Sequence, residues 1–368
     1  MHQAPPTCDI FCRVIDNYGD IGVCWRLARQ LQEEYGWQMR LWVDELSVFK
    51  QLAREPGGVD VRAWEAPFPQ VTPAEIVIEA FACELPENYL SAMAQASTKP
   101  TWINLEYLSV EDWSSGFHGQ PSPHPRLPLT KHFFFPGVLP GNGGTLCEHD
   151  LLARRDSFDI TAARLHYTTK PEGLWTFLFC YDNPALPFLL NSWAASERPV
   201  HCLIAAGKAH EQVSRWLGKP IIPGLVQQSG QLSLYALPFV AQSEFDKFLW
   251  MSDLNFVRGE DSFCRAQWAA LPFIWQIYPQ AGEAHHLKLD TFYRHYDFGL
   301  TPSSQTALDS FSVLWNGMAP STQESTTTAW RQLSAALPTL HAQAISWQKQ
   351  LAQQGNLAEN LAIFCKRL

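Results

Sequence analysis

Residues 9–22, DIFCRVIDNYGDIG, contain the pattern that decides the fold class. The run 9–14 is short and apolar, which predicts a buried strand, and 15–22 is a loop with two glycines. The apolar residues that follow recur at helical spacing, at Val23, Leu27 and Leu31. A strand, a tight loop and a helix in this order are the first unit of an α/β fold with a parallel sheet.

The same alternation of strands and helices continues along the chain. Further strands are predicted at 39–43, 59–64, 75–81, 101–105, 174–181, 200–205, 232–239, 254–257 and 273–278. Helical patterns lie between them, at 87–97 (between the breakers Pro86 and Pro100), 186–195, 209–217, 243–251 and 263–271. We therefore predict two Rossmann-like, doubly wound domains that face each other across a cleft.

The stretch 114–150 marks the boundary between the two domains. It is rich in Gly, Pro and His, which predicts an irregular excursion rather than further alternation. We expect an N-terminal domain over 1–152 and a C-terminal domain over 153–345. A C-terminal helix over 346–368 is expected to pack back on the N-terminal domain.

The last part of the chain has a helical pattern with two interruptions. We expect helix from 329 to 368, interrupted at Pro338 and Gly355. The polar tract STQESTTT, 321–328, before it predicts a surface loop.

Composition excludes several classes of protein. The net charge of the 368 residues, 27 − 36 = −9, disfavours a protein that coats nucleic acid or an anionic membrane. The start shows no basic region followed by a long apolar run, so we expect no signal peptide. The longest apolar runs are far shorter than the ~18 residues of a membrane span. The 9 cysteines are scattered, without a Cys-x-x-Cys pair, which argues against a disulfide framework or a zinc ribbon. We expect a soluble, cytoplasmic protein.

Several familiar signatures are missing from the sequence. There is no Gly-x-Gly-x-x-Gly, no phosphate-binding loop ending in Gly-Lys-Ser/Thr, no His-Glu-x-x-His and no Gly-x-Ser-x-Gly. The pair His285-His286 has no nearby partner at metal-ligand spacing. A dehydrogenase, a P-loop phosphotransferase and a metal site are therefore disfavoured.

Asp16 and Asp20 stand in the first loop, where open α/β sheets bind ligands at the end of the first strand. Two carboxylates four residues apart are able to converge on one nucleophile, as a base and its partner. The alternative is structural: Asp20 caps the following helix and Asp16 closes an Asx-turn. Spacing alone leaves both interpretations open.

The tract RGEDSF, 258–263, follows a predicted strand and precedes a helix. The amide donors of a helix N-terminus bind phosphate, and Arg258 adds charge-assisted hydrogen bonds. Glu260 and Asp261 would repel phosphate, so they suit ribose or sugar hydroxyls better. The alternative is an ordinary cap by Asp261 or Ser262, with Arg258 in a local ion pair.

Phe179 and Tyr181 stand at the end of the second domain's first predicted strand and point the same way, because side chains alternate along a strand. An aromatic ring at this edge is able to stack on a nucleobase. Core packing is an equally good account of Phe179. Gln242, before a predicted helix, carries an amide suited to a pyrimidine edge.

Three stretches closely resemble the bacterial elongation factor P arginine rhamnosyltransferases, the EarP family. They are CDIFCRVIDNYGDIGVCWRLARQL (8–31), INLEYLSVEDW (103–113) and LNFVRGEDSFCRAQWAALPFIWQIYPQ (254–280). The resemblance runs over essentially the whole chain in the same order. It implies a GT-B glycosyltransferase that transfers L-rhamnose from dTDP-β-L-rhamnose, with inversion, to one arginine of elongation factor P.

The resemblance also implies roles for individual residues. Asp20 matches the general base and Asp16 its neighbouring carboxylate. The residues that match the donor-binding set are Phe179, Tyr181 and Gln242 around thymine, and Arg258, Glu260, Asp261 and Ser262 around ribose, diphosphate and rhamnose. No cofactor or metal is expected. Two alternatives stay open: another nucleotide-sugar or acceptor, and a non-catalytic nucleotide-sugar-binding partner of a translation factor.

Overall fold

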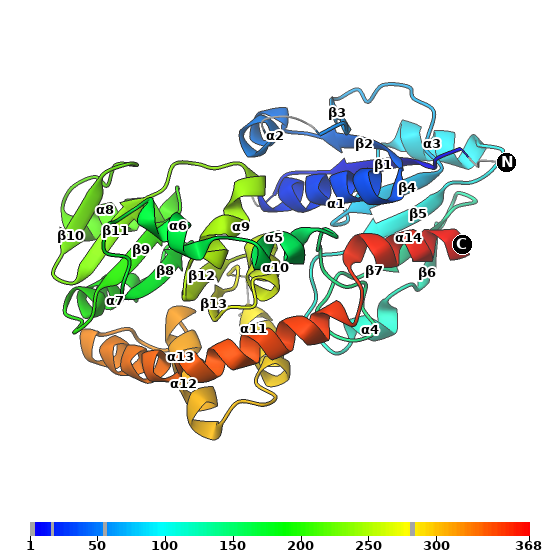
Figure 1. The fold of residues 1–368 in the computed structure, drawn as a ribbon. Helices are drawn as coiled ribbons and strands as arrows, with labels where there is room; N and C mark the ends of the chain where they lie inside the picture. The colour runs from blue at the N-terminus through cyan, green and yellow to red at the C-terminus, as the bar shows by residue number, and fades with distance from the viewer. Residues whose placement is uncertain (1–3, 16–17, 54–56, 280–283) are drawn as a thin grey trace. The chain divides into compact units, whose positions relative to one another are not determined.

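The computed structural model describes residues 4–15, 18–53, 57–279 and 284–368. It divides the chain into two compact units. Unit 1 comprises Met1–His149 and Leu351–Leu368, and unit 2 comprises Asp150–Gln350. The chain therefore leaves unit 1 at residue 149 and returns to it at residue 351, within the long helix near its end (Figure 1).

Unit 1 is built on a seven-stranded sheet in the order β3-β2-β1-β4-β5-β7-β6. The strands are β1 Thr7–Cys12, β2 Gln38–Val43, β3 Asp60–Ala63, β4 Ile76–Ala80, β5 Thr101–Leu105, β6 Pro121–Pro123 and β7 Thr130–Phe134. Its helices are α1 Gly19–Tyr35, α2 Leu46–Leu52, α3 Glu87–Gln95, α4 Ser114–Phe117 and α14 Leu357–Arg367. All strand pairs are parallel except β6 with β7.

Strand β1 is buried on both faces, which is why its sequence is a nearly continuous apolar run. Ile10 belongs to the core cluster that also includes residues of α1, while its neighbour Phe11 belongs to the cluster on the other face. The one charged residue of this strand, Asp9, is buried and accepts two hydrogen bonds from Arg40 at 2.5 and 2.6 Å. A buried carboxylate is costly unless it is paired and hydrogen-bonded, and the pairing with Arg40 meets this requirement for Asp9.

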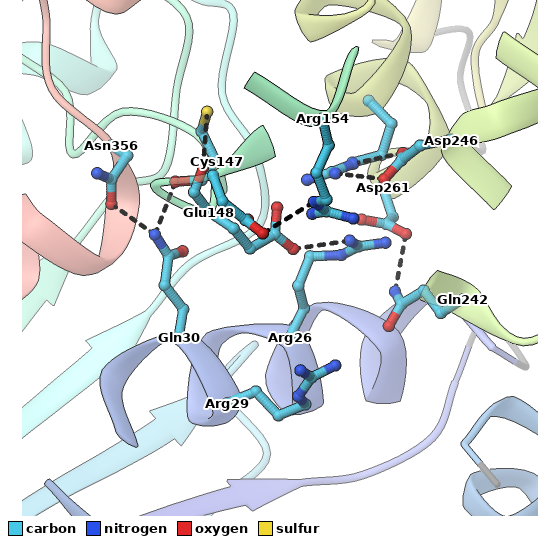
Figure 2. A network of polar contacts seen from close by, with 12 residues as sticks. Arg26, Arg29, Gln30, Cys147, Glu148, Arg154, Gln242, Asp246, Asp261 and Asn356 are labelled. Carbon is cyan, nitrogen blue, oxygen red and sulfur yellow. Dashed lines mark hydrogen bonds and ion pairs between the residues drawn. The ribbon is translucent and has the colours of Figure 1, made fainter. Parts of the chain in front are cut away.

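The C-terminal helix α14 completes the core of unit 1. Its buried face, including Leu357 and Leu361, belongs to the same apolar cluster as α1. Gln30 of α1 donates to the carbonyl of Cys147 at 2.7 Å and to Asn356 Oδ1 at 3.2 Å (Figure 2). This single amide thus ties α1 to the segment where the chain leaves unit 1 and to the segment where it returns.

Unit 2 is built on a six-stranded sheet in the order β10-β11-β9-β8-β12-β13. The strands are β8 Leu174–Leu178, β9 Val200–Ile204, β10 Val226–Ser229, β11 Leu232–Ala236, β12 Leu254–Arg258 and β13 Phe273–Gln276, of which only β10 is antiparallel to its neighbour. The helices are α5 Leu151–Asp156, α6 Ile160–Leu165, α7 Leu186–Ala194, α8 Lys208–Leu217, α9 Gln242–Trp250, α10 Asp261–Trp268, α11 Ala284–Tyr296, α12 Pro302–Trp315 and α13 Gln323–Ala352.

Each sheet has one point at which the strand order reverses. In unit 1 the chain runs outward from β1 to β3 and then returns to place β4 on the other side of β1. In unit 2 it runs outward from β8 through β9 and then places β12 on the other side of β8. Ligands of open α/β sheets bind beside such switch points, at the carboxyl ends of the strands. The loops after β1, β4, β8 and β12 are therefore the places to look for a site.

The predictions of an irregular stretch at 114–150, of a surface loop at 321–328 and of a helix break at Pro338 were wrong in part. The supposed irregular excursion contributes two strands, β6 and β7, to the sheet. Pro121 and Pro123 made β6 look like a loop in the sequence, but β6 is an edge strand, where proline is tolerated. The tract 321–328 is mostly helix, since α13 begins at Gln323, and α13 continues through Pro338, whereas the chain does break at Gly355 between α13 and α14.

The predicted bounds differ from the observed ones by a few residues. The division falls after His149 and after Gln350, where the sequence predicted 152 and 345. Strand β8 ends at Leu178, so Phe179 and Tyr181 lie beyond the regular strand on which they were placed. Apolar residues that pack over a sheet edge extend the strand pattern past the last ladder residue, which explains the longer prediction.

Candidate active site

Asp20 lies in the first turn of α1, directly after the loop at the switch point of unit 1. It is only 3% exposed, and its Oδ2 accepts a hydrogen bond of 2.8 Å from the backbone amide of Ile15. The N-cap of α1 is Tyr18, so Asp20 does not hold the ordinary N-cap position that the structural alternative gave it. Its carboxylate instead closes the β1–α1 loop. Asp16 lies outside the described residues.

The surroundings of Asp20 carry negative charge. The pKa of the buried Cys12 thiol is raised by a hydrogen bond to Cys24 and by burial, with further contributions from the nearby carboxylates of Asp20 and Asp44. Asp44 accepts a hydrogen bond of 3.0 Å from the amide of Val14, in the same loop. Two carboxylates thus bind successive amides of one loop, and such a place favours a positively charged group.

In unit 2, the carboxyl ends of β8 and β12 bring Arg258 against two aromatic rings. The guanidinium carbon of Arg258 lies 4.4 Å from the ring centre of Phe179 and 4.5 Å from that of Tyr181. A guanidinium is planar and stacks well on aromatic faces, so the rings hold its charge in place at the switch point. The sequence placed the rings against a nucleobase; the structure shows that one partner of both rings is Arg258.

The RGEDS tract forms a tight turn into α10. Gly259 has a φ of +61°, in the left-handed region that favours glycine. The Ser262 hydroxyl accepts from the amide of Arg258 at 3.0 Å and donates to its carbonyl at 2.5 Å, which pins the start of the turn. The N-cap is Glu260, not Asp261 or Ser262, and Glu260 forms an ion pair of 3.3 Å with Lys288. The amides of the first turn of α10 point away from the helix and suit a phosphate.

Two side-chain contacts, one helical turn apart, tie α9 to α10. Gln242 Nε2 donates to Asp261 Oδ2 at 3.0 Å (Figure 2). Arg265 donates to both oxygens of Asp246 at 2.8 and 2.5 Å. The Arg265–Asp246 pair is almost fully buried. The amide oxygen of Gln242, also buried, has no hydrogen-bond partner among the described residues. The first turn of α10 is therefore held at a set distance from α9.

Comparison with known proteins decides the family. The model of the family described as "Elongation-Factor P (EF-P) rhamnosyltransferase EarP" matches residues 8–366. A relative from Pseudomonas putida named "Protein-arginine rhamnosyltransferase" is 45% identical over 97% of this chain and 98% of its own length. One of the same name from Neisseria meningitidis serogroup B is 34% identical over 100% and 99%. The chain belongs to the EarP family.

Solved structures agree with this assignment. One described as "Structural basis for EarP-mediated arginine glycosylation of translation elongation factor EF-P" is 34% identical, covers 98% of this chain and 99% of its own, and superposes with a TM-score of 0.71. The glycosyltransferase MurG of Acinetobacter baumannii, at 10% identity and a TM-score of 0.54, shares the fold alone. The predicted GT-B fold class is confirmed, and this EarP-family chain is a protein-arginine rhamnosyltransferase.

Sequence reasoning missed two glutamines that support the loop after β8 in this EarP-family enzyme. Gln276 Oε1 accepts from the amide of Tyr181 at 2.8 Å, and Gln212 bonds the Tyr181 carbonyl at 2.9 Å and the Asn183 amide at 2.7 Å. They hold the segment after β8 from two sides. No local sequence pattern identifies them, because a glutamine in a helix or at the end of a strand most often has no special role. Their burial beside a loop, which only the structure shows, is what indicates that they support it.

Two further observations concern the described residues of this EarP-family chain. Within the ranges that the structure describes, no three side chains of His, Cys, Asp or Glu lie together as a metal ion would need. In those ranges, too, every helix is either too short or too polar to span a lipid bilayer.

Replacing Asp246 by Ala in this EarP-family enzyme is expected to lower the free energy of unfolding by about 3–5 kcal/mol. The reason is that Arg265, fully buried, loses the carboxylate that neutralises it. Chemical denaturation measures this effect. The exposed pair Lys247–Glu244 on the same helix is the control: Glu244→Ala should change stability by less than about 1 kcal/mol.

Proposed function

We propose that the enzyme transfers L-rhamnose from dTDP-β-L-rhamnose to one arginine of elongation factor P, with inversion at the sugar carbon. Family membership and the likeness to a solved EarP structure described with EF-P support this choice of sugar and acceptor. The observation that carries the donor assignment is Arg258, held over Phe179 and Tyr181 at the switch point of unit 2 beside the N-terminus of α10.

The donor is proposed to bind on unit 2. The diphosphate would accept hydrogen bonds from Arg258 and from the first-turn amides of α10. The buried, unpartnered amide oxygen of Gln242 suits the N–H of a thymine ring, which is a donor. Phe179 and Tyr181 would contribute ring surface to the base as well as holding Arg258. Glu260, Asp261 and Ser262 would bind hydroxyls of ribose and rhamnose.

The acceptor arginine is proposed to react on unit 1, at Asp20. A free guanidinium has a pKa above ~12, so no carboxylate removes its proton beforehand. Asp20 would orient the guanidinium, polarise one N–H bond and take that proton as the N–C bond to the sugar forms. The bond between the sugar carbon and the phosphate oxygen breaks in the same step, and dTDP leaves with its electron pair.

The leaving group gains negative charge as this bond breaks. Arg258 and the amides of Ser262 and Phe263 supply positive charge and donors for it, so we propose that no metal ion is required. The test is therefore run with and without a chelator. If the chelator abolishes turnover and added magnesium restores it, the metal-free mechanism is wrong.

The experiment that tests the function combines purified enzyme, dTDP-β-L-rhamnose and intact elongation factor P. We expect dTDP release together with a mass gain of one deoxyhexose on one arginine. A different nucleotide-sugar or acceptor that turns over faster would replace the assigned substrates. Binding of dTDP-rhamnose without turnover on any acceptor would make the chain a binding partner and contradict the proposal.

A further inference from the structure

A partly open pocket of about 140 Å³ lies at the carboxyl ends of β1 and β4 in unit 1. It is lined by Arg13 and Ile15 after β1, by Ala80 at the end of β4 and by the segment 81–84 that follows. This is the switch point of the sheet, and Ile15 is the residue whose amide binds Asp20. The volume is well below the ~300–1,000 Å³ of pockets for drug-sized ligands, so it suits one side chain rather than a nucleotide-sugar.

The wall after β4 has an unusual backbone. Phe81, Ala82 and Glu84 have φ values of +57°, +52° and +56°, and Cys83 closes the turn with a hydrogen bond of 3.2 Å from its amide to the Ala80 carbonyl. A turn with two central residues at positive φ is normally built from Gly, Asn or Asp. Three non-glycine residues in this region cost free energy, and such segments cluster at functional sites.

The buried carboxylate of Glu79 keeps this turn in shape. Glu79 is 2% exposed, and its Oε1 accepts from the Glu84 amide at 3.1 Å. Its other oxygen accepts from Trp102 Nε1 at 3.1 Å and pairs with Lys131 at 3.3 Å. On the turn itself, the Phe81 ring stacks on Tyr107 with 4.4 Å between the ring centres. Contacts that involve residues of β5 and β7 thus fix the turn after β4 in a backbone conformation that its own non-glycine residues disfavour.

The lining of the pocket suits a guanidinium on a long apolar stem. Glu84 is exposed and offers a carboxylate, Phe81 offers a ring, and Ala80 to Cys83 offer an apolar wall. Carboxylates and aromatic faces are the two surfaces that bind a guanidinium best. Among the described residues of the lining, the one cation is Arg13, whose guanidinium carbon lies over the Trp64 ring, 4.8 Å from its centre. That contact gives its charge a partner of its own.

We propose that this pocket is the subsite for the side chain of the acceptor arginine, with Glu84 as the carboxylate that pairs with it. Glu79 is a positioning residue, which acts through the turn and does not touch the substrate. The inference rests on the proposed function, because it names where in unit 1 the arginine lies before Asp20 takes its proton. It also accounts for a strained turn that catalysis by Asp20 alone does not need.

The test measures kcat and KM for intact elongation factor P at saturating dTDP-rhamnose, and dTDP affinity by calorimetry. Glu84→Gln is expected to raise the acceptor KM at least tenfold and to leave dTDP affinity unchanged. Glu87→Gln, which removes an exposed acid three residues further on, is the matched control and should change neither. Equal KM values for wild type and Glu84→Gln, beside normal wild-type turnover, would overturn the subsite and leave the proposed function standing.

The positioning role is tested separately. Glu79→Ala should raise the acceptor KM, and Glu79→Gln, which keeps an oxygen for the Glu84 amide, should restore much of the loss. Because Glu79→Ala removes a buried ion-pair partner, Ala82→Val provides a second variant: a β-branched residue resists positive φ and should distort the turn without touching the carboxylate. A wild-type acceptor KM in folded Ala82→Val, checked by circular dichroism, would overturn the role of the turn.

Discussion

Asp20→Asn is expected to lower the rate of rhamnose transfer by about 10²–10⁴-fold, the usual contribution of a general base. Asparagine has the same shape and still accepts the hydrogen bond from Ile15, so the loop after β1 should keep its structure. What it loses is the ability to take a proton. Because Asp20 belongs to unit 1 and the proposed donor site to unit 2, dTDP affinity should stay within about twofold of wild type.

Asp44→Asn is the matched control for this prediction. Asp44 accepts from the amide of Val14 just as Asp20 accepts from that of Ile15, but it is exposed and follows β2 rather than β1. We expect near-normal transfer from this variant. Asp20→Asn with activity within a few-fold of wild type would remove Asp20 from the role of base. Equal losses in both variants would show that the loop's charge, not proton transfer, matters.

Arg258→Ala is expected to weaken dTDP binding about 10–100-fold, measured by calorimetry without acceptor. Hydrogen bonds to charged groups contribute about 1.5–3 kcal/mol, and 1.4 kcal/mol is a factor of ten in affinity. Arg258→Lys should recover only part of this loss, because an ammonium lacks the planar face that lies over Phe179 and Tyr181.

Arg294→Ala serves as the control on the same unit, since Arg294 is exposed and pairs with Asp290 on its own helix. It should bind dTDP as the wild type does. Unchanged dTDP affinity in Arg258→Ala would show that the RGEDS tract only shapes the start of α10. Together with Asp20→Asn, the two variants separate donor binding from transfer, because each should affect one and spare the other.

Much of the architecture could be predicted because it depends on local pattern. The apolar runs at β1, β5 and β9 are buried on both faces, so a continuous hydrophobic stretch marks each of them. The tract 258–263 stands between a strand and a helix in the sequence, and this alone places it at a carboxyl edge. Edge strand β6 could not be found in this way, because its prolines resemble loop.

The candidate site was harder to predict, because its contacts join residues far apart in the chain. Phe179 and Tyr181 looked like surfaces for a base, and only the pairing of β8 with β12 shows that Arg258 lies over them. Gln242 was matched to a pyrimidine from its side-chain chemistry, and only the structure shows that its amide nitrogen also donates to Asp261, 19 residues away. Glu79 and the turn after β4 carried no recognisable motif at all.

The α/β class, the two domains and the loops that carry the charged tracts were predictable from the amino-acid order alone, because hydrophobic periodicity and the length of apolar runs depend only on neighbouring residues. Which side chains meet depends on the folded chain. The strand order places β4 beside β1 and β12 beside β8, and that order brings the Phe81–Glu84 turn to the loop of Asp20 and the rings of β8 to Arg258. Strand order depends on packing between distant segments, and no local pattern encodes it.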